Sequence, residues 1–87
     1  MSRASTDFKK RVEKVFEEAF PEAVVDVSSG YGGNVHVVLV SKRFNRMSEE
    51  DKQALAWDVA RGQLAADELL RVSIIFAYGP RELKAVG

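Results

Sequence analysis

The stretch that decides the fold runs over residues 35–48 and reads Val35-His36-Val37-Val38-Leu39-Val40-Ser41-Lys42-Arg43-Phe44-Asn45-Arg46-Met47-Ser48. Its first half is a short apolar run rich in β-branched residues, which predicts a buried β-strand over 35–41. Its second half leads into a helix, because Ser48 followed by Asp51 resembles a capping box. The stretch therefore predicts a strand that passes through a tight connection into a capped helix.

The residues before this stretch predict a helix and a hairpin. Apolar residues recur at helical spacing from Phe8 to Phe20 with charged residues between them, so an amphipathic helix is expected there. Ser5 or Thr6 can cap its start, and Pro21 ends it. The valine-rich run 23–28 predicts a strand, which the glycine-rich segment 29–34 joins to the central strand as an antiparallel hairpin.

The residues after the stretch predict a second helix and a third strand. The second helix starts at Ser48, and Gly62 is placed to end or bend it, with a second short helical piece over 64–70. We expect Leu55 and Trp57 to anchor this helix on the sheet. The run 72–78 is β-rich and becomes the third strand, followed by Gly79-Pro80 and a tail over 81–86 with one helical turn.

The predicted fold is a single α+β domain over 1–87 with the order α-β-β-α-β, the second helix being broken. Its three-stranded sheet carries helices on one face, and residues 1–6 and 84–87 are expected to be flexible ends. Eighty-seven residues suffice for one modest hydrophobic core. The chain has no secretory signal and no apolar run long enough to span a membrane, so a cytoplasmic protein without membrane contact is expected.

Composition narrows the function. There is no cysteine, which excludes disulfides and any thiolate-held metal or iron–sulfur site built by this chain alone. Thirteen basic and thirteen acidic residues cancel, which argues against strong non-specific binding to nucleic acid. The single histidine, His36, lies within a strand, and no serine has a base in a recognisable arrangement. The sequence therefore predicts no enzyme and no catalytic residue.

The second face of the predicted sheet is apolar as well. On the central strand Val35, Val37 and Leu39 point one way, and His36, Val38 and Val40 point the other. On the third strand Val72, Ile74, Phe76 and Tyr78 oppose Ser73, Ile75 and Ala77. Two interpretations stay open. Either the tail and loops cover part of this face, or it meets a protein partner or a second copy, which gives a homodimer through the open sheet face.

Two further features are candidate contact sites. The glycines of Gly30-Tyr31-Gly32-Gly33 either supply positive φ angles in the hairpin or let a backbone approach phosphate; a P-loop lysine and serine are absent. Tyr31 at the tip is a candidate contact residue. A basic cluster forms the other feature, either as a solvated polar face or as a contact for nucleic acid or a partner. Its residues, extended along the chain, are Lys42, Arg43, Arg46, Lys52, Arg61 and Arg71.

The chain resembles the BolA-like family over roughly Phe8 to Leu83. The central strand matches the family pattern V-x-V-S-x-x-F over 38–44, and 77–83 is similar to its closing A-x-T-P-x-E-W motif. The resemblance implies a fold related to type II KH domains and a non-enzymatic role in stress response, regulation or iron–sulfur homeostasis. The helix thought to contact DNA often carries an Arg-His-Arg-like motif in the family, and Lys52, Gln53 and Ala54 occupy those positions here.

The resemblance also bears on metal binding. BolA-like proteins usually have a histidine at the start of the third strand, which helps to ligate a [2Fe–2S] cluster shared with a monothiol glutaredoxin. Arg71 falls at that position, and arginine has no lone pair to offer a metal. The second family ligand, a cysteine or histidine in the hairpin loop, is missing from 28–34. His36 is the one weak candidate left, so we expect no bound metal and no cofactor.

The leading hypothesis is therefore a BolA-like protein that acts through protein partners, with a monothiol glutaredoxin as the partner that the resemblance implies and with cluster ligation lost. The alternative is a nucleic-acid-binding regulatory module that uses the basic residues named above.

Overall fold

The computed structural model describes residues 5–86, and side chains over residues 5–83. The predicted order of elements is confirmed, including the broken second helix. Of the predicted flexible ends, residues 1–4 and 87 lie outside the described residues, whereas Thr6 already begins the first helix and residues 84–86 belong to the last one. The elements are α1 (Thr6–Ala19), β1 (Val24–Ser29), the 3-10 turn η1 (Tyr31–Gly33), β2 (Val35–Val40), the 3-10 turn η2 (Lys42–Phe44), α2 (Glu49–Gln63), α3 (Ala66–Leu69), β3 (Val72–Tyr78) and α4 (Pro80–Val86).

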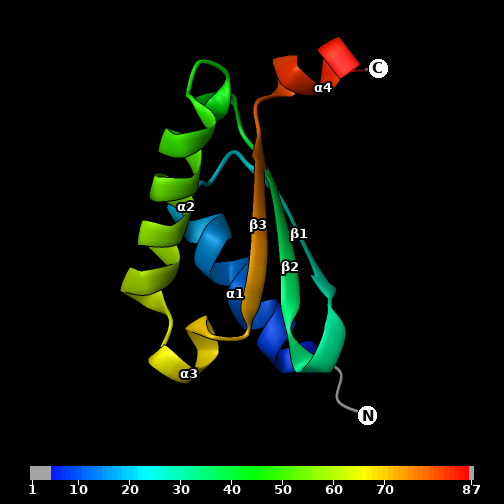
Figure 1. Cartoon of the computed structure of the whole chain (residues 1–87), viewed down its shortest axis with the longest axis vertical. Helices are drawn as coiled ribbons and strands as arrows, with labels where there is room; N and C mark the ends of the chain where they lie inside the picture. The colour runs from blue at the N-terminus through cyan, green and yellow to red at the C-terminus, as the bar shows by residue number, and fades with distance from the viewer. Residues whose placement is uncertain (1–4, 87) are drawn as a thin grey trace.

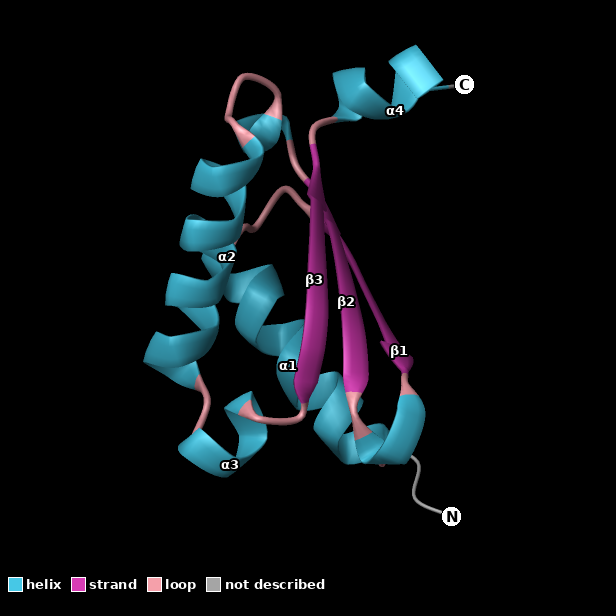
Figure 2. Ribbon diagram, viewed as in Figure 1, coloured by secondary structure: helices cyan, strands magenta, loops and turns pink. Residues whose placement is uncertain are grey.

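The three strands form one mixed sheet in the order β1-β2-β3. β1 and β2 make the predicted antiparallel hairpin, and β3 runs parallel to β2. A parallel neighbour requires a crossover, which α2 and α3 supply. Figures 1 and 2 show α1 and α2 packed on the same side of the sheet, so the core lies between one helical layer and one sheet face.

Helix α1 forms as its apolar periodicity predicts. Ser5 is the N-cap, and its hydroxyl accepts a hydrogen bond of 3.0 Å from the Phe8 N–H. The buried stripe of the helix meets the sheet through Val12 and Phe16, both without exposed surface. Just after the helix, Phe20 packs edge-to-face against Phe44 of the β2–α2 connection, with ring centroids 5.5 Å apart. This pair closes one end of the core.

Helix α2 packs on the sheet differently from the prediction. Ser48 caps it by accepting from the Asp51 N–H at 3.1 Å, as expected. The residues that face the sheet without exposure are Lys52, Ala56 and Ala60, at i, i+4 and i+8. Leu55 and Trp57 are only partly buried and pack at the margins of the core. Residues two apart lie on different sides of a helix, so these two cannot both face the sheet, and their assignment as the anchor was wrong.

The predicted faces are confirmed on β2 and wrong at the first two positions of β3, Val72 and Ser73. Val35, Val37 and Leu39 are fully buried. The β2–β3 register shifts between Val35 and His36: Val35 pairs with Val72, but His36 pairs with Ile74. This irregularity places Val72 on the core side together with Ile75 and Ala77, and leaves Ile74, Phe76 and Tyr78 on the other face. Strict alternation fails because one extra residue enters the strand.

Candidate functional site

The face of the sheet that carries no helix is apolar and accessible. The exposed fractions of Val24, Ile74 and Phe76 are 67%, 38% and 40%. The rings of Phe76 and Tyr78 stack nearly parallel, with centroids 6.1 Å apart. Helix α4 lies beyond the end of the strands and not along them (Figure 1), so the tail does not cover this face. Cover by the tail is therefore wrong, whereas partial cover by loops and contact with a partner both stay predictions.

The hairpin end of the sheet brings Arg71 onto the glycine loop. Gly32 and Gly33 have φ values of 66° and 85°, which confirms the predicted positive angles. Arg71, just before β3, donates from Nε and Nη2 to the Gly33 carbonyl at 3.3 and 3.2 Å. Its guanidinium carbon also lies 4.5 Å from the ring centroid of Phe8, a cation–π contact. The structure thus places side by side the two positions where the resemblance puts metal ligands.

The residues at this end do not fit a cluster of the family type. Arginine carries no free lone pair, and the Arg71 guanidinium is held by a carbonyl and a ring. His36 lies on the open face of the sheet, paired with Ser28 and Ile74. Within the described residues, no three His, Cys, Asp or Glu side chains gather in a way that could hold a metal ion.

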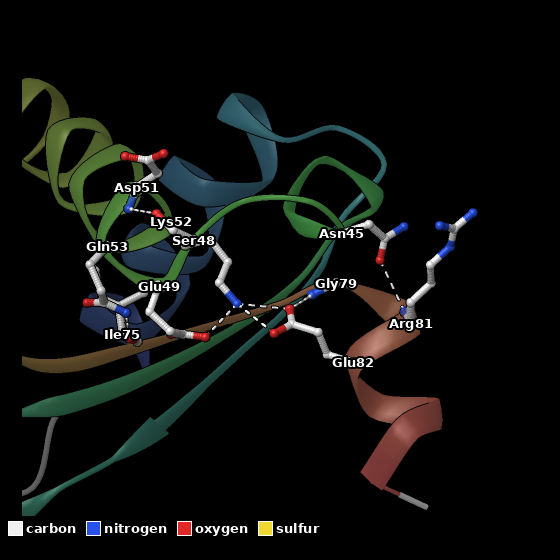
Figure 3. Close-up of polar contacts among 10 residues, drawn as sticks. All are labelled: Asn45, Ser48, Glu49, Asp51, Lys52, Gln53, Ile75, Gly79, Arg81 and Glu82. Carbon is white, nitrogen blue, oxygen red and sulfur yellow. Dashed lines mark hydrogen bonds and ion pairs between the residues drawn. The ribbon is translucent and has the colours of Figure 1, made fainter.

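Lys52 lies at the opposite end of the molecule and is a structural residue. Its side chain has no exposed surface, and Nζ contacts Glu49 Oε1 at 2.7 Å and both carboxylate oxygens of Glu82 at 2.9 Å (Figure 3). Burial by itself lowers the pKa of Lys52, but hydrogen bonds and charge from the two glutamates outweigh it and raise the pKa. The predicted contact role of Lys52 was wrong, because a buried and paired ammonium offers nothing to a phosphate.

Glu82 connects Lys52 to the start of α4. Its Oε1 also accepts from the Gly79 N–H at 2.6 Å, and Asn45 Oδ1 accepts from the Arg81 N–H at 3.1 Å (Figure 3). These two bonds satisfy N–H groups at the beginning of the helix, which otherwise have no partner. The Gly79 N–H, and then Lys52, lower the pKa of Glu82. We call Lys52, Glu82, Gly79 and Asn45 the α4 clasp.

Sequence reasoning missed the α4 clasp and a second contact at the outer edge of β3. Gln53 Nε2 donates to the Ile75 carbonyl at 2.7 Å, and Trp57 Nε1 donates to Gln53 Oε1 at 3.2 Å. The available signals were a proline and a glutamate following Gly79, as in the first turn of a helix, and the i, i+4 spacing of Gln53 and Trp57.

The remaining candidate contact residues do not converge on one surface. Lys42, Arg43 and Arg46 are exposed on the β2–α2 connection, and Arg43 lies 5.1 Å from the Phe20 ring centroid. Arg81, which the sequence did not single out, is exposed near them. Tyr31 is 89% exposed at the other end of the sheet, where Arg71 also lies. The last candidate, Arg61, pairs with Asp58 at 2.6 Å on the exposed side of α2.

The arrangement described above, with one helical layer on a β1-β2-β3 sheet and a short helix after the last strand, is a BolA-like α+β fold. The solution structure of the BolA1 protein from Mus musculus matches it with a TM-score of 0.71, over 99% of this chain and 75% of that one, at 21% sequence identity. No protein-family model and no curated protein sequence matches this chain. Among the described residues, no helix has the length and apolar character needed to cross a membrane.

Proposed function

We propose that this chain is a BolA-like protein without enzymatic activity, which acts by binding a monothiol glutaredoxin and does so without sharing an iron–sulfur cluster. The observation that carries the proposal is the position of Arg71, with its guanidinium on the Gly33 carbonyl. The BolA-like fold supports the class of protein, and the motifs at 38–44 and 77–83 support the family. The role would lie in stress response, regulation or iron–sulfur homeostasis.

Binding of a partner and ligation of a cluster are separate contributions to such a complex. The exposed apolar side chains of the open sheet face, Val24, Ile74 and Phe76, provide contact area without a metal. Ligation would need Arg71 to be replaced by a group with a lone pair, because moving the arginine aside still leaves no donor in its place. We therefore expect an association whose strength does not depend on the cluster.

The test compares binding of a monothiol glutaredoxin in its apo and cluster-loaded forms. Calorimetry should give similar affinities for both, and the visible circular dichroism of the loaded glutaredoxin should not change when this protein is added. Arg71→His is the informative variant, because it restores an imidazole that can ligate a metal. A new heterodimer-type spectrum with the wild-type protein, lost in His36→Ala, would show that His36 ligates the cluster and would contradict the proposal. Absence of any binding would contradict the choice of partner.

The exposed basic residues around the β2–α2 connection favour a second candidate, a nucleic-acid-binding module. Lys42, Arg43 and Arg46 form one group at one end of the sheet, whereas the other basic candidate residues are scattered. A salt titration of binding to generic DNA and RNA tests this, because affinity based on phosphate contacts falls steeply as salt rises. Arg43→Ala with Arg46→Ala should weaken such binding, whereas Arg61→Ala, which removes a cation already paired with Asp58, is the matched control.

A further inference from the structure

The two edges of the sheet are protected to different degrees. At β3 the Gln53 amide occupies the outward Ile75 carbonyl, and the register irregularity at the start of the strand disturbs its pairing geometry. β1 has neither device: it pairs with β2 through six successive residues without a shift, and it contains no proline. It forms the margin of the sheet in Figure 2, and helix α1 packs against it from one face of the sheet. Unprotected edge strands are templates for pairing with another strand.

The hydrogen-bonding pattern of the hairpin shows which groups of β1 point outward. The Gly30 N–H donates to the Asn34 carbonyl at 2.7 Å, so residue 30 directs its backbone groups toward β2. Direction alternates along a strand, and therefore Ser28, Asp26 and Val24 also face β2. The groups of Val25, Val27 and Ser29 point away from the sheet. Outside the β1–β2 ladder, no backbone hydrogen bond among the described residues involves these three.

We propose that β1 pairs with β1 of a second copy of this chain, antiparallel and centred on Val27, to give a dimer with a continuous six-stranded sheet. In this register Val27 faces Val27, and Val25 faces Ser29 of the other copy. The N–H and C=O groups of the residues in these pairs point away from β2 and toward the other copy, so each pair can form two hydrogen bonds.

Charge selects this register over its neighbour. Centring the pair one residue earlier would place the two Asp26 carboxylates directly opposite each other, which is unfavourable. Centring on Val27 instead places each Asp26 opposite Ser28 of the other copy, on the open face where both side chains are exposed. The same register directs the hairpin turn, whose Tyr31 ring is 89% exposed, toward Ala23 of the other copy. The exposed tyrosine thereby gains a contact.

The edge fits a second copy better than the open sheet face does. A face of three strands and about six residues measures roughly 15 Å by 20 Å from standard strand spacings, or roughly 300 Å². This flat area is below the roughly 800 Å² that stable interfaces bury per partner, so a stable complex through this face needs additional contact surface. Edge pairing depends on main-chain hydrogen bonds and gives a weak, concentration-dependent dimer, which is independent of any glutaredoxin binding.

Ser28 offers a matched pair of variants that test the register itself. Ser28→Lys places a cation opposite Asp26 twice in the dimer and should tighten it about 2- to 30-fold, from the usual range for cross-strand pairs. Ser28→Asp places like charges opposite each other and should weaken it by a similar factor. Sedimentation equilibrium from micromolar to millimolar protein measures both, and thermal melting of dilute protein verifies that each variant folds. A wild-type chain that stays monomeric at millimolar concentration would overturn the proposal, as would Lys and Asp variants that shift the equilibrium equally.

Amide hydrogen exchange by NMR gives a residue-specific check on the wild-type protein. The N–H groups of Val25, Val27 and Ser29 should become protected as the concentration rises, whereas those of Asp26 and Ser28 should be protected throughout by β2. A dimer whose formation protects β3 residues instead, or protects no strand at all, would show that the interface lies elsewhere and that the assignment to β1 is wrong.

Discussion

Replacement by alanine should destabilise the protein at Gly79 and stabilise it at Gly62. A Cβ atom added at Gly79 would lie 2.6 Å from the Cα and 2.7 Å from the backbone nitrogen of Asn45. Distances below 3 Å to backbone atoms cannot be relieved by a rotamer change, so Gly79→Ala must push the start of α4 away from Asn45. Forced overpacking typically costs about 1–3 kcal/mol. For a domain of this size that lowers the thermal midpoint by about 5–20 °C.

Gly62→Ala is the internal control. A Cβ at Gly62, near the end of α2, meets nothing within 4 Å. Replacing a helical glycine by alanine stabilises a helix by up to about 1 kcal/mol, and a position near the helix end takes the lower part of this range. We expect a rise of a few degrees in the thermal midpoint. Urea unfolding of both variants measures the two effects, and a Gly79→Ala protein as stable as the wild type would refute the packing of the β3–α4 turn against Asn45.

Three further predictions follow from single contacts. The pKa of Glu82 is lowered by the Gly79 N–H and by Lys52. Its contribution to stability is therefore present above the unfolded pKa of 4.5 and is lost as the pH falls through the lower folded pKa. Between pH 4.5 and more acidic pH, the urea midpoint of Glu82→Gln should fall less than that of the wild type. Equal falls of the two midpoints with pH would contradict this. Gly32 has a φ of 66° and open space around it, so Gly32→Ala should destabilise the fold by about 1–2 kcal/mol through backbone strain alone. Partner binding should weaken only in proportion to the loss of folded protein. A variant that folds normally but loses one ligand would instead indicate that the glycine loop contacts that ligand. Trp57→Ala should lower the free energy of unfolding by about 2 kcal/mol, less than the roughly 3–5 kcal/mol lost with a fully buried tryptophan. Ala56→Leu should lower it more, because the larger side chain forces the helix off the sheet. If urea unfolding showed Trp57→Ala to be the more destabilised variant, Trp57 would be the anchor after all.

The candidate sites were only partly predictable from the chain. The exposure of Lys42, Arg43, Arg46 and Tyr31 agrees with the sequence-based expectation, because residues on connections between elements usually face solvent. Arg71 lies beside the hairpin loop, and its match to the histidine position of the BolA-like family stays a prediction. The α4 clasp could not be predicted, because Lys52 and Glu82 are 30 residues apart in the sequence. In addition, a lysine among the acidic residues of a helix's first turn is usually exposed to solvent.

The sequence by itself determined the order of the elements and placed their ends within about two residues. Periodicity and caps are local properties, so the stripe of α1, the Ser48 cap and the apolar run of β2 could be recognised within a few residues of each other. The tertiary structure alone decided the shifted register at Val72, the alanine face of α2 and the burial of Lys52. Each of these depends on which distant segment lies opposite, and the free energy of such contacts depends on partners that the local pattern does not contain.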